Sequence, residues 1–108
     1  MESSEPEPAA AEKSVFLTAK FVHPPLDFRV LHLGEEIWTV ESAGETELFG
    51  EASIVIPKEG IDLLIEARWP EETPKTALEL TLAPDSLDDQ STTHWGTGEM
   101  DAVATYKW

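Results

Sequence analysis

Hydrophobic side chains recur at every second position in most segments of this chain, and this spacing most constrains what the chain can fold into. The clearest segment is TALELTLAP (76–84), in which leucines at 78, 80 and 82 alternate with alanine, glutamate and threonine. Successive side chains of a β-strand point to opposite faces, so period two predicts strands with one buried face. No window of eleven residues or more has the i, i+3, i+4 spacing of an amphipathic helix. The chain is therefore predicted to be all-β.

Prolines and glycine-containing turns divide this pattern into short strands. Prolines at 24, 25, 57, 70, 74 and 84 all lie where the alternation stops, as expected of a residue that cannot donate to a strand ladder. We expect strands within 15–23, 27–33, 37–41, 45–57, 61–69 and 76–84, with a final pair or one broken strand between 92 and 108. Gly50 is predicted to lie at a bulge or kink. About seven strands at this spacing predict an antiparallel β-sandwich.

The first fourteen residues differ from the rest. They hold four Glu, two Pro, three Ala and three Ser, and cannot bury enough apolar surface to offset the entropy of ordering. We predict a disordered acidic linker or tail over 1–14 and one β-sandwich domain over 15–108, since 108 residues suffice for a single domain.

The segmentation, the EARW stretch (66–69) and the alternating ALELTLAP (77–84) resemble bacterial immunoglobulin-like and fibronectin-III-like sandwich domains. The resemblance covers residues 15–108 and implies an immunoglobulin-like fold. It also implies a module for spacing, adhesion or partner binding, commonly outside the cytoplasm and attached to a membrane anchor or a larger protein. It implies no catalytic residues.

The charge balance limits the partners of the domain. Seven Lys and Arg oppose 22 Asp and Glu, which gives a net charge of −15. This balance argues against nucleic acid and against direct contact with anionic membranes, both of which need basic side chains. It favours a soluble monomer. The partner expected from the charge is a protein with a basic surface.

No catalytic motif is found in the chain. The chain has no cysteine, and it lacks the GxSxG, GxxxxGK[ST], GxGxxG and HExxH patterns. Its three histidines, His23, His32 and His94, have none of the spacings of zinc ligands. We therefore predict that the protein is not an enzyme.

One acidic stretch is the candidate metal site. Residues 85–101 contain no Lys or Arg, and Ca²⁺ is the metal that such carboxylates would suit. The spacing is not that of an EF-hand, because Gln90 occupies the glycine position. The candidate metal ligands are Asp85, Asp88, Asp89, Glu99 and Asp101. The alternative is a solvated loop whose acids keep a sheet edge from pairing with another chain. No other cofactor is expected.

Four tryptophans suggest a second kind of site. An aromatic shelf beside carboxylates can stack on a sugar ring, and Trp95 with His94 and the Asp88/Asp89 loop is the candidate ligand-binding set. A glycan-binding module predicts that Trp95 faces solvent, whereas a structural module predicts that it packs. We expect Trp95 to anchor a turn at Gly96 and Gly98 against the core.

The predicted function is a non-catalytic binding or spacer module, and the alternative is a glycan-binding or Ca²⁺-assisted ligand-binding module. The chain has no apolar run near the ~20 residues that cross a bilayer, and its start is unlike a signal peptide. We expect the soluble domain of a membrane-anchored or exported bacterial protein, tethered in the periplasm or outside the cell. If Met1 is the native start, a cytoplasmic protein is expected instead.

Overall fold

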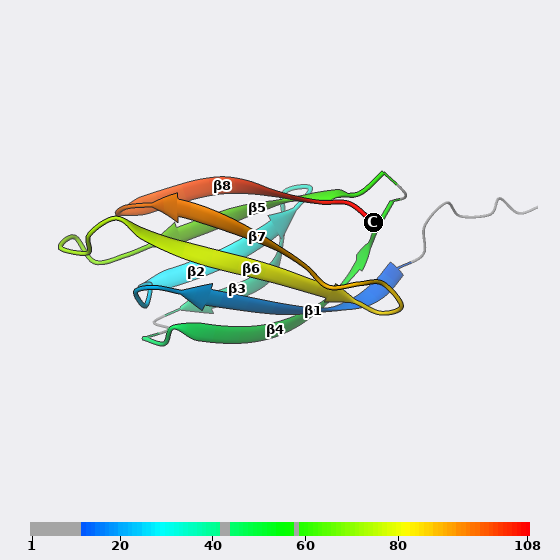
Figure 1. Ribbon diagram of the computed structural model, residues 1–108, viewed down its shortest axis with the longest axis horizontal. Helices are drawn as coiled ribbons and strands as arrows, with labels where there is room; N and C mark the ends of the chain where they lie inside the picture. Colours follow the sequence, from blue (N-terminus) through cyan, green and yellow to red (C-terminus); the bar gives the residue numbers. More distant parts are fainter. Residues whose placement is uncertain (1–11, 42–43, 58) are drawn as a thin grey trace, which may run out of the picture.

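Eight strands form two four-stranded antiparallel sheets in the computed structural model, which describes residues 12–41, 44–57 and 59–108. The first sheet has the order β4-β1-β6-β7 and lies in front of the second, β3-β2-β5-β8, in Figure 1. The predicted antiparallel sandwich is confirmed, with eight strands where about seven were expected. The strands are β1 (Glu12–Phe21), β2 (Asp27–His32), β3 (Glu35–Glu41), β4 (Glu47–Val55), β5 (Ile61–Arg68), β6 (Thr76–Pro84), β7 (Gln90–Gly96) and β8 (Glu99–Tyr106).

The first strand begins earlier than the alternation indicated. Residues 1–11 of the predicted tail lie outside the described residues, whereas Glu12, Lys13 and Ser14 belong to β1. Their backbones pair with β4, where Glu12 lies opposite Val55. Pairing with the long strand β4 thus extends β1 toward the N-terminus, beyond Val15, its first buried residue. None of the described residues lies in a helix that is long and apolar enough to span a membrane.

The core lies between the sheets and is built from the faces that the alternation selected. Leu17, Leu63 and Leu80, from three different strands, are completely buried. Trp69 is also buried, and its Nε1 donates to the backbone oxygen of His23 at 2.8 Å. The core residues of β1, β5 and β6 are Val15, Leu17, Ala19, Phe21, Ile61, Leu63, Ile65, Ala67, Leu78, Leu80 and Leu82.

The strand order differs from that of constant immunoglobulin domains. In those domains the first strand lies at the edge of its sheet, whereas β1 lies inside its sheet between β4 and β6. The likeness therefore extends to the two-layer antiparallel architecture.

The predicted bulge at Gly50 is wrong, because β4 keeps its register along β1 and Gly50 lies opposite Leu17. The register shift occurs instead between β2 and β3, at Val30 and Leu31. Gly50 has a different role: an added Cβ would lie 2.5 Å from Cε2 of Trp38. Trp38 belongs to the other sheet, so its indole covers β4 and closes this side of the sandwich.

A polar cluster lies between β7 and β8, which are edge strands of the two different sheets. Tyr106 Oη donates to the backbone oxygen of Leu80 at 2.8 Å, and it lies 3.0 Å from Thr92 Oγ1. His94 Nε2 lies 2.8 Å from the same Thr92 oxygen. Burial raises the pKa of Tyr106 to about 12 and lowers the pKa of His94. Burial therefore favours the neutral form of both groups near pH 7, because charge is disfavoured away from water.

Candidate functional site

An open depression of about 1050 Å³ lies over the outer face of the second sheet. We call this surface the acidic face. Its lining includes two arginines, Arg29 and Arg68, and no lysine. The acids that line it are Asp27, Glu36, Glu41, Glu66, Glu99 and Asp101. Six acids against two arginines give a formal charge of −4.

Strand register brings these side chains together from four strands. In β2, Phe28 and Val30 are buried, so the alternating Asp27 and Arg29 point outward. The same alternation operates in β3, β5 and β8, and pairing aligns the outward side chains in rows. One row is Glu41, Asp27, Arg68 and Glu99, and the next is Thr39, Arg29, Glu66 and Asp101.

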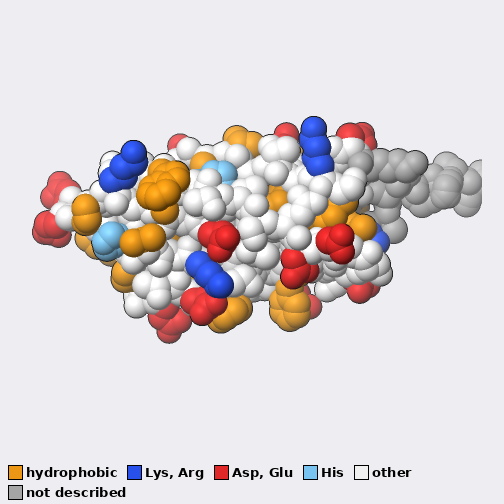
Figure 2. Space-filling view, in the orientation of Figure 1, with side chains coloured by type: hydrophobic (Ala, Val, Ile, Leu, Met, Phe, Trp, Pro, Cys, Tyr) orange, Lys and Arg blue, Asp and Glu red, His pale blue; other side chains and the backbone are white. Residues whose placement is uncertain are grey.

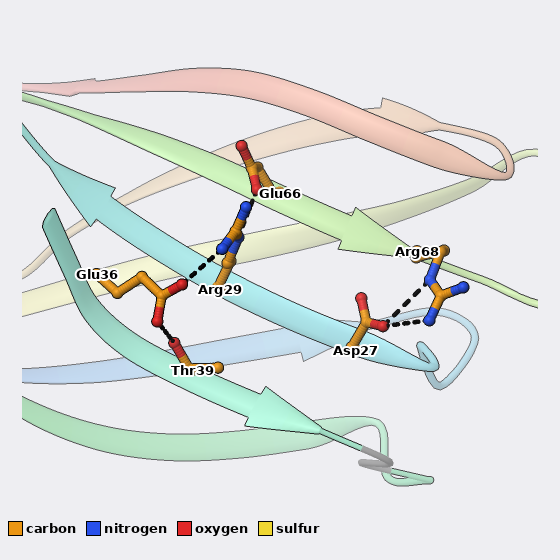
Figure 3. Close-up of polar contacts among 6 residues, drawn as sticks. All are labelled: Asp27, Arg29, Glu36, Thr39, Glu66 and Arg68. Atoms are coloured by element: carbon orange, nitrogen blue, oxygen red, sulfur yellow. Dashed lines mark hydrogen bonds and ion pairs between the residues drawn. The ribbon is translucent and has the colours of Figure 1, made fainter. Parts of the chain in front are cut away.

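Arg29 lies at the centre of the acidic face and binds two carboxylates (Figure 3). Its Nε donates to Glu66 Oε1 and its Nη1 to Glu36 Oε2, both at 2.5 Å. Thr39 donates to the other oxygen of Glu36 at 2.9 Å. These bonds raise the pKa of Arg29, chiefly through Glu66, and lower the pKa of Glu36, chiefly through Thr39 and then Arg29. The guanidinium is held in one orientation across three strands.

Arg68 forms the second ion pair of this surface. Its Nη2 and Nε donate to the same Asp27 oxygen, at 2.6 and 3.1 Å (Figure 3). The bond to Asp27, with a smaller contribution from Glu99, raises the pKa of Arg68. Both partners are about half exposed, and solvent screening leaves an exposed pair of this kind little net effect on stability. The pair therefore orders the surface more than it stabilises the domain.

Three acids of this face are outside the ion pairs formed among the described residues. Glu41, Glu99 and Asp101 form no ion pair with another described residue. Both arginines are already neutralised by neighbouring carboxylates, so the potential over the depression stays negative. Low-dielectric walls focus such a field and raise the local concentration of cations.

The five predicted metal ligands do not form one site. Asp85, Asp88 and Asp89 lie in the turn between β6 and β7, whereas Glu99 and Asp101 begin β8. Strand β7 separates the two groups, a length of roughly 20 Å. No three Asp, Glu or His side chains come together as a metal site within the described part of the chain. Only Glu99 and Asp101 belong to the acidic face.

The four residues of the predicted ligand site are also dispersed. Successive side chains of β7 alternate, so His94 turns to the polar cluster while Trp95 points to solvent. Asp88 and Asp89 lie beyond the other end of β7, where the backbone oxygen of Asp88 accepts a bond from Trp108 Nε1 at 2.6 Å.

Our expectation that Trp95 packs against the core is wrong. The side chain is 66% exposed, because the turn residue that contacts the core is Gly96, which lies against Met100. Trp95 instead shares the outer face of the first sheet with Ala77, its partner on β6. The exposed face of this sheet carries scattered hydrophobic side chains between carboxylates (Figure 2).

The residues of the acidic face other than Glu99 and Asp101 were not among our candidates. The signal is present in the sequence as opposite charges two positions apart, in DFR (27–29) and EAR (66–68). Alternation places each pair on one face of its strand. Which strands are neighbours determines which charges meet, and local spacing does not give that order.

Comparison with known protein families, curated proteins and solved structures finds no match for this chain.

Proposed function

We propose that this domain is a non-catalytic binding module and that its acidic face binds a basic segment of a partner protein. One observation carries the proposal: an open concavity of about 1050 Å³ in which six acids outnumber two arginines that already have carboxylate partners. A surface that carries mostly negative charge attracts a positively charged partner. Such attraction raises the rate of association more than it raises the affinity of the complex.

The geometry also supports a polypeptide partner over a small cation. The acids lie on four adjacent strands, which span roughly 14 Å at the spacing of about 4.8 Å between strands. Glu41 and Glu99 lie at opposite ends of one row. Several lysines or arginines of one partner could reach this row and its neighbour together.

We expect replacement of Glu41, Glu99 and Asp101 by lysine to weaken binding of a deca-lysine peptide at least about tenfold. The triple variant adds six units of charge and turns the formal charge of the face from −4 to +2. The matched control replaces Glu47, Glu51 and Glu79 by lysine on the outer face of the first sheet, with the same change in net charge. Isothermal titration calorimetry at an ionic strength of about 0.15 M, where the Debye length is about 8 Å, measures both.

The control variant is expected to bind deca-lysine within about threefold of the wild type, since distant exposed charges are screened over about a Debye length. Equal losses in the two triple variants would show that net charge alone attracts the peptide, and the assignment of the site to this face would then be wrong.

Trp95 favours a second candidate function, the glycan-binding module. A glycan-binding module predicts that the Trp95 indole faces solvent, as it does. The polar side chains beside the indole are not the predicted His94, Asp88 and Asp89. Thr93 lies two positions earlier on the same face of β7, and Glu79 lies opposite Thr93 on β6. A sugar ring could stack on the indole while its hydroxyl groups bond to these side chains.

Cellohexaose and chitohexaose are suitable probes of this second function. We expect binding in the millimolar range, about −4 kcal/mol, that is lost in Trp95→Ala and kept in Phe49→Ala. Phe49 is the matched control because it is 68% exposed on the same sheet. Tryptophan fluorescence follows the titration. Binding that survives Trp95→Ala, or no binding at all, would leave the acidic face as the sole candidate.

The likeness to bacterial immunoglobulin-like and fibronectin-III-like domains extends this proposal to a tethered module that also acts as a spacer. The acidic sequence that precedes β1 would serve as its stalk. Placement of the module outside the cytoplasm follows from this likeness and belongs to the proposal.

A further inference from the structure

The four edge strands of the sandwich are protected unequally. Edges expose unpaired backbone groups, and natural proteins commonly block them with charged side chains. The edges are β3 and β8 in the second sheet and β4 and β7 in the first. Strand β3 carries three Glu, β4 two Glu, and β8 one Glu and one Asp. Strand β7, with the sequence QSTTHWG, has neither an acid, a lysine, an arginine nor a proline.

Strand β7 is also regular and open along its outer side. It pairs with β6 over seven consecutive positions without a register shift, from Gly96 opposite Thr76 to Gln90 opposite Leu82. The side chain of Gln90, the first residue of β7, is hydrogen-bonded to the backbone of Lys107. This contact covers the beginning of β7. Over positions 91–96, no described residue outside β6 forms a backbone hydrogen bond with β7. In a two-stranded ladder about half of the backbone groups of each strand point away from the partner.

The side chains of β7 suit an added strand. Thr92, Thr93 and Trp95 are residue types that favour extended pairing. His94 adds no charge near pH 7, because burial lowers its pKa.

The acids that we expected to protect this edge lie beyond its two ends. Asp85, Asp88 and Asp89 precede β7, Glu99 and Asp101 follow it, and no Lys or Arg occurs anywhere in 85–101. An uncharged strand thus lies between two acidic stretches of the chain, and Lys107 is the basic residue bonded to its first position, Gln90.

We propose that the free edge of β7 binds an extended segment of another polypeptide by strand addition. The segment has about six uncharged residues that pair with positions 91–96, and Lys or Arg at each end opposite the flanking acids. This site is the backbone edge of β7 and goes beyond the acidic face on the other sheet, with which it shares the flanking acids Glu99 and Asp101. A second copy of the chain is a poorer occupant, since each copy carries a net charge of −15.

The test uses the full chain labelled with ¹⁵N and the peptide acetyl-KRVTVTVTRK-amide. We expect amide shifts at positions 91–96 and inter-strand contacts between peptide and β7. A peptide with proline at its fifth position, KRVTPTVTRK, keeps the charges and is expected to bind at least about tenfold more weakly, because proline cannot donate to a ladder.

The variant Thr93→Asp separates strand addition from simple attraction of charge. An added acid strengthens attraction of a basic peptide, but a charge in the middle of an edge strand opposes pairing. We expect Thr93→Asp to weaken binding at least about tenfold, and Ser53→Asp, an exposed position on the β4 edge of the same sheet, to change it by less than about twofold. Thermal unfolding confirms that both variants fold.

Three results would overturn the proposal: equal or tighter binding by Thr93→Asp, equal binding of the proline peptide, or shifts confined to the acidic face. A dimer that dissociates on Thr93→Asp substitution would make a second copy the occupant and would equally contradict it. Binding of deca-lysine by Thr93→Asp should stay within about twofold of the wild type, since that probe reports the acidic face. Failure of one site is therefore distinguishable from failure of the other.

Discussion

Replacement of Gly50 by valine is expected to lower the free energy of unfolding by about 3 kcal/mol, because Trp38 occupies the space above this glycine. A Cβ there would lie 2.5 Å from both Cε2 and Nε1 of the indole. Trp38 also makes an edge-to-face contact with Phe28, with ring centroids 5.2 Å apart. Displacing the indole therefore opens the side of the sandwich between β3 and β4. Urea denaturation measures the loss.

Two controls isolate the contact between the sheets. Ser53→Val makes a similar change at an exposed position of the same strand, where valine favours extended backbone, and is expected to be neutral. In a Trp38→Ala background the cost of Gly50→Val should fall by at least about half, as expected of two residues in contact. An undiminished cost in that background would mean that Gly50 is needed for backbone reasons.

Raising the pH from 10 to 12 is expected to destabilise the domain by on the order of 2 kcal/mol through Tyr106 alone. Burial raises the pKa of this phenol to about 12 in the folded chain, against about 10 in an unfolded one. Between these values the unfolded state releases the phenolic proton and the folded state keeps it. The unfolded state then binds fewer protons, so stability falls as pH rises, whereas titration of Tyr106 leaves stability unchanged well below pH 10.

Tyr106→Phe provides the reference for this pH dependence. The variant loses the bonds of the phenol to Leu80 and Thr92, which should cost about 1–2 kcal/mol at pH 7. Its stability should decline less steeply between pH 10 and 12, because the lysines titrate alike in both proteins. Parallel curves for the two proteins in chemical denaturation would contradict a raised pKa.

The two proposed binding surfaces differ in how the acidic residues of the chain are distributed. One surface is rich in acids, and the other is a strand that has none. On the second sheet, acids gather over a concave face and leave a negative potential for a basic partner. On the first sheet, acids stop short of β7 and leave an uncharged edge between two negative ends. A partner could engage both surfaces, since Glu99 and Asp101 line the acidic face and directly follow β7 in the chain.

Local alternation correctly predicted what each strand buries. Leu78, Leu80 and Leu82 face the core as the sequence indicated, and so does Trp69. Prolines marked the strand ends, and the final segment forms two strands around its glycines. These features depend on side-chain direction and backbone geometry within a few residues, which are properties of the local sequence.

The errors concern contacts that alternation along a single strand does not reveal. Gly50 was expected at a bulge. Instead, a glycine is needed there because the indole of Trp38, twelve residues earlier and on the other sheet, leaves no room for a Cβ. Trp95 was expected in the core, but Gly96 and Met100 fill the space beside the turn. The predicted acids were grouped by nearness in sequence, although a strand of seven residues separates them in space.

The sequence by itself determined the all-β class, the strand boundaries to within a few residues, the buried faces and the negative charge. Only the tertiary structure decided which strands are neighbours. That order places Arg29 between Glu36 and Glu66, leaves Trp95 exposed and makes β7 an edge. The physical reason is that period two fixes the face to which a side chain points, whereas its neighbours on that face come from strands far along the chain. Their order depends on the packing of the whole sandwich.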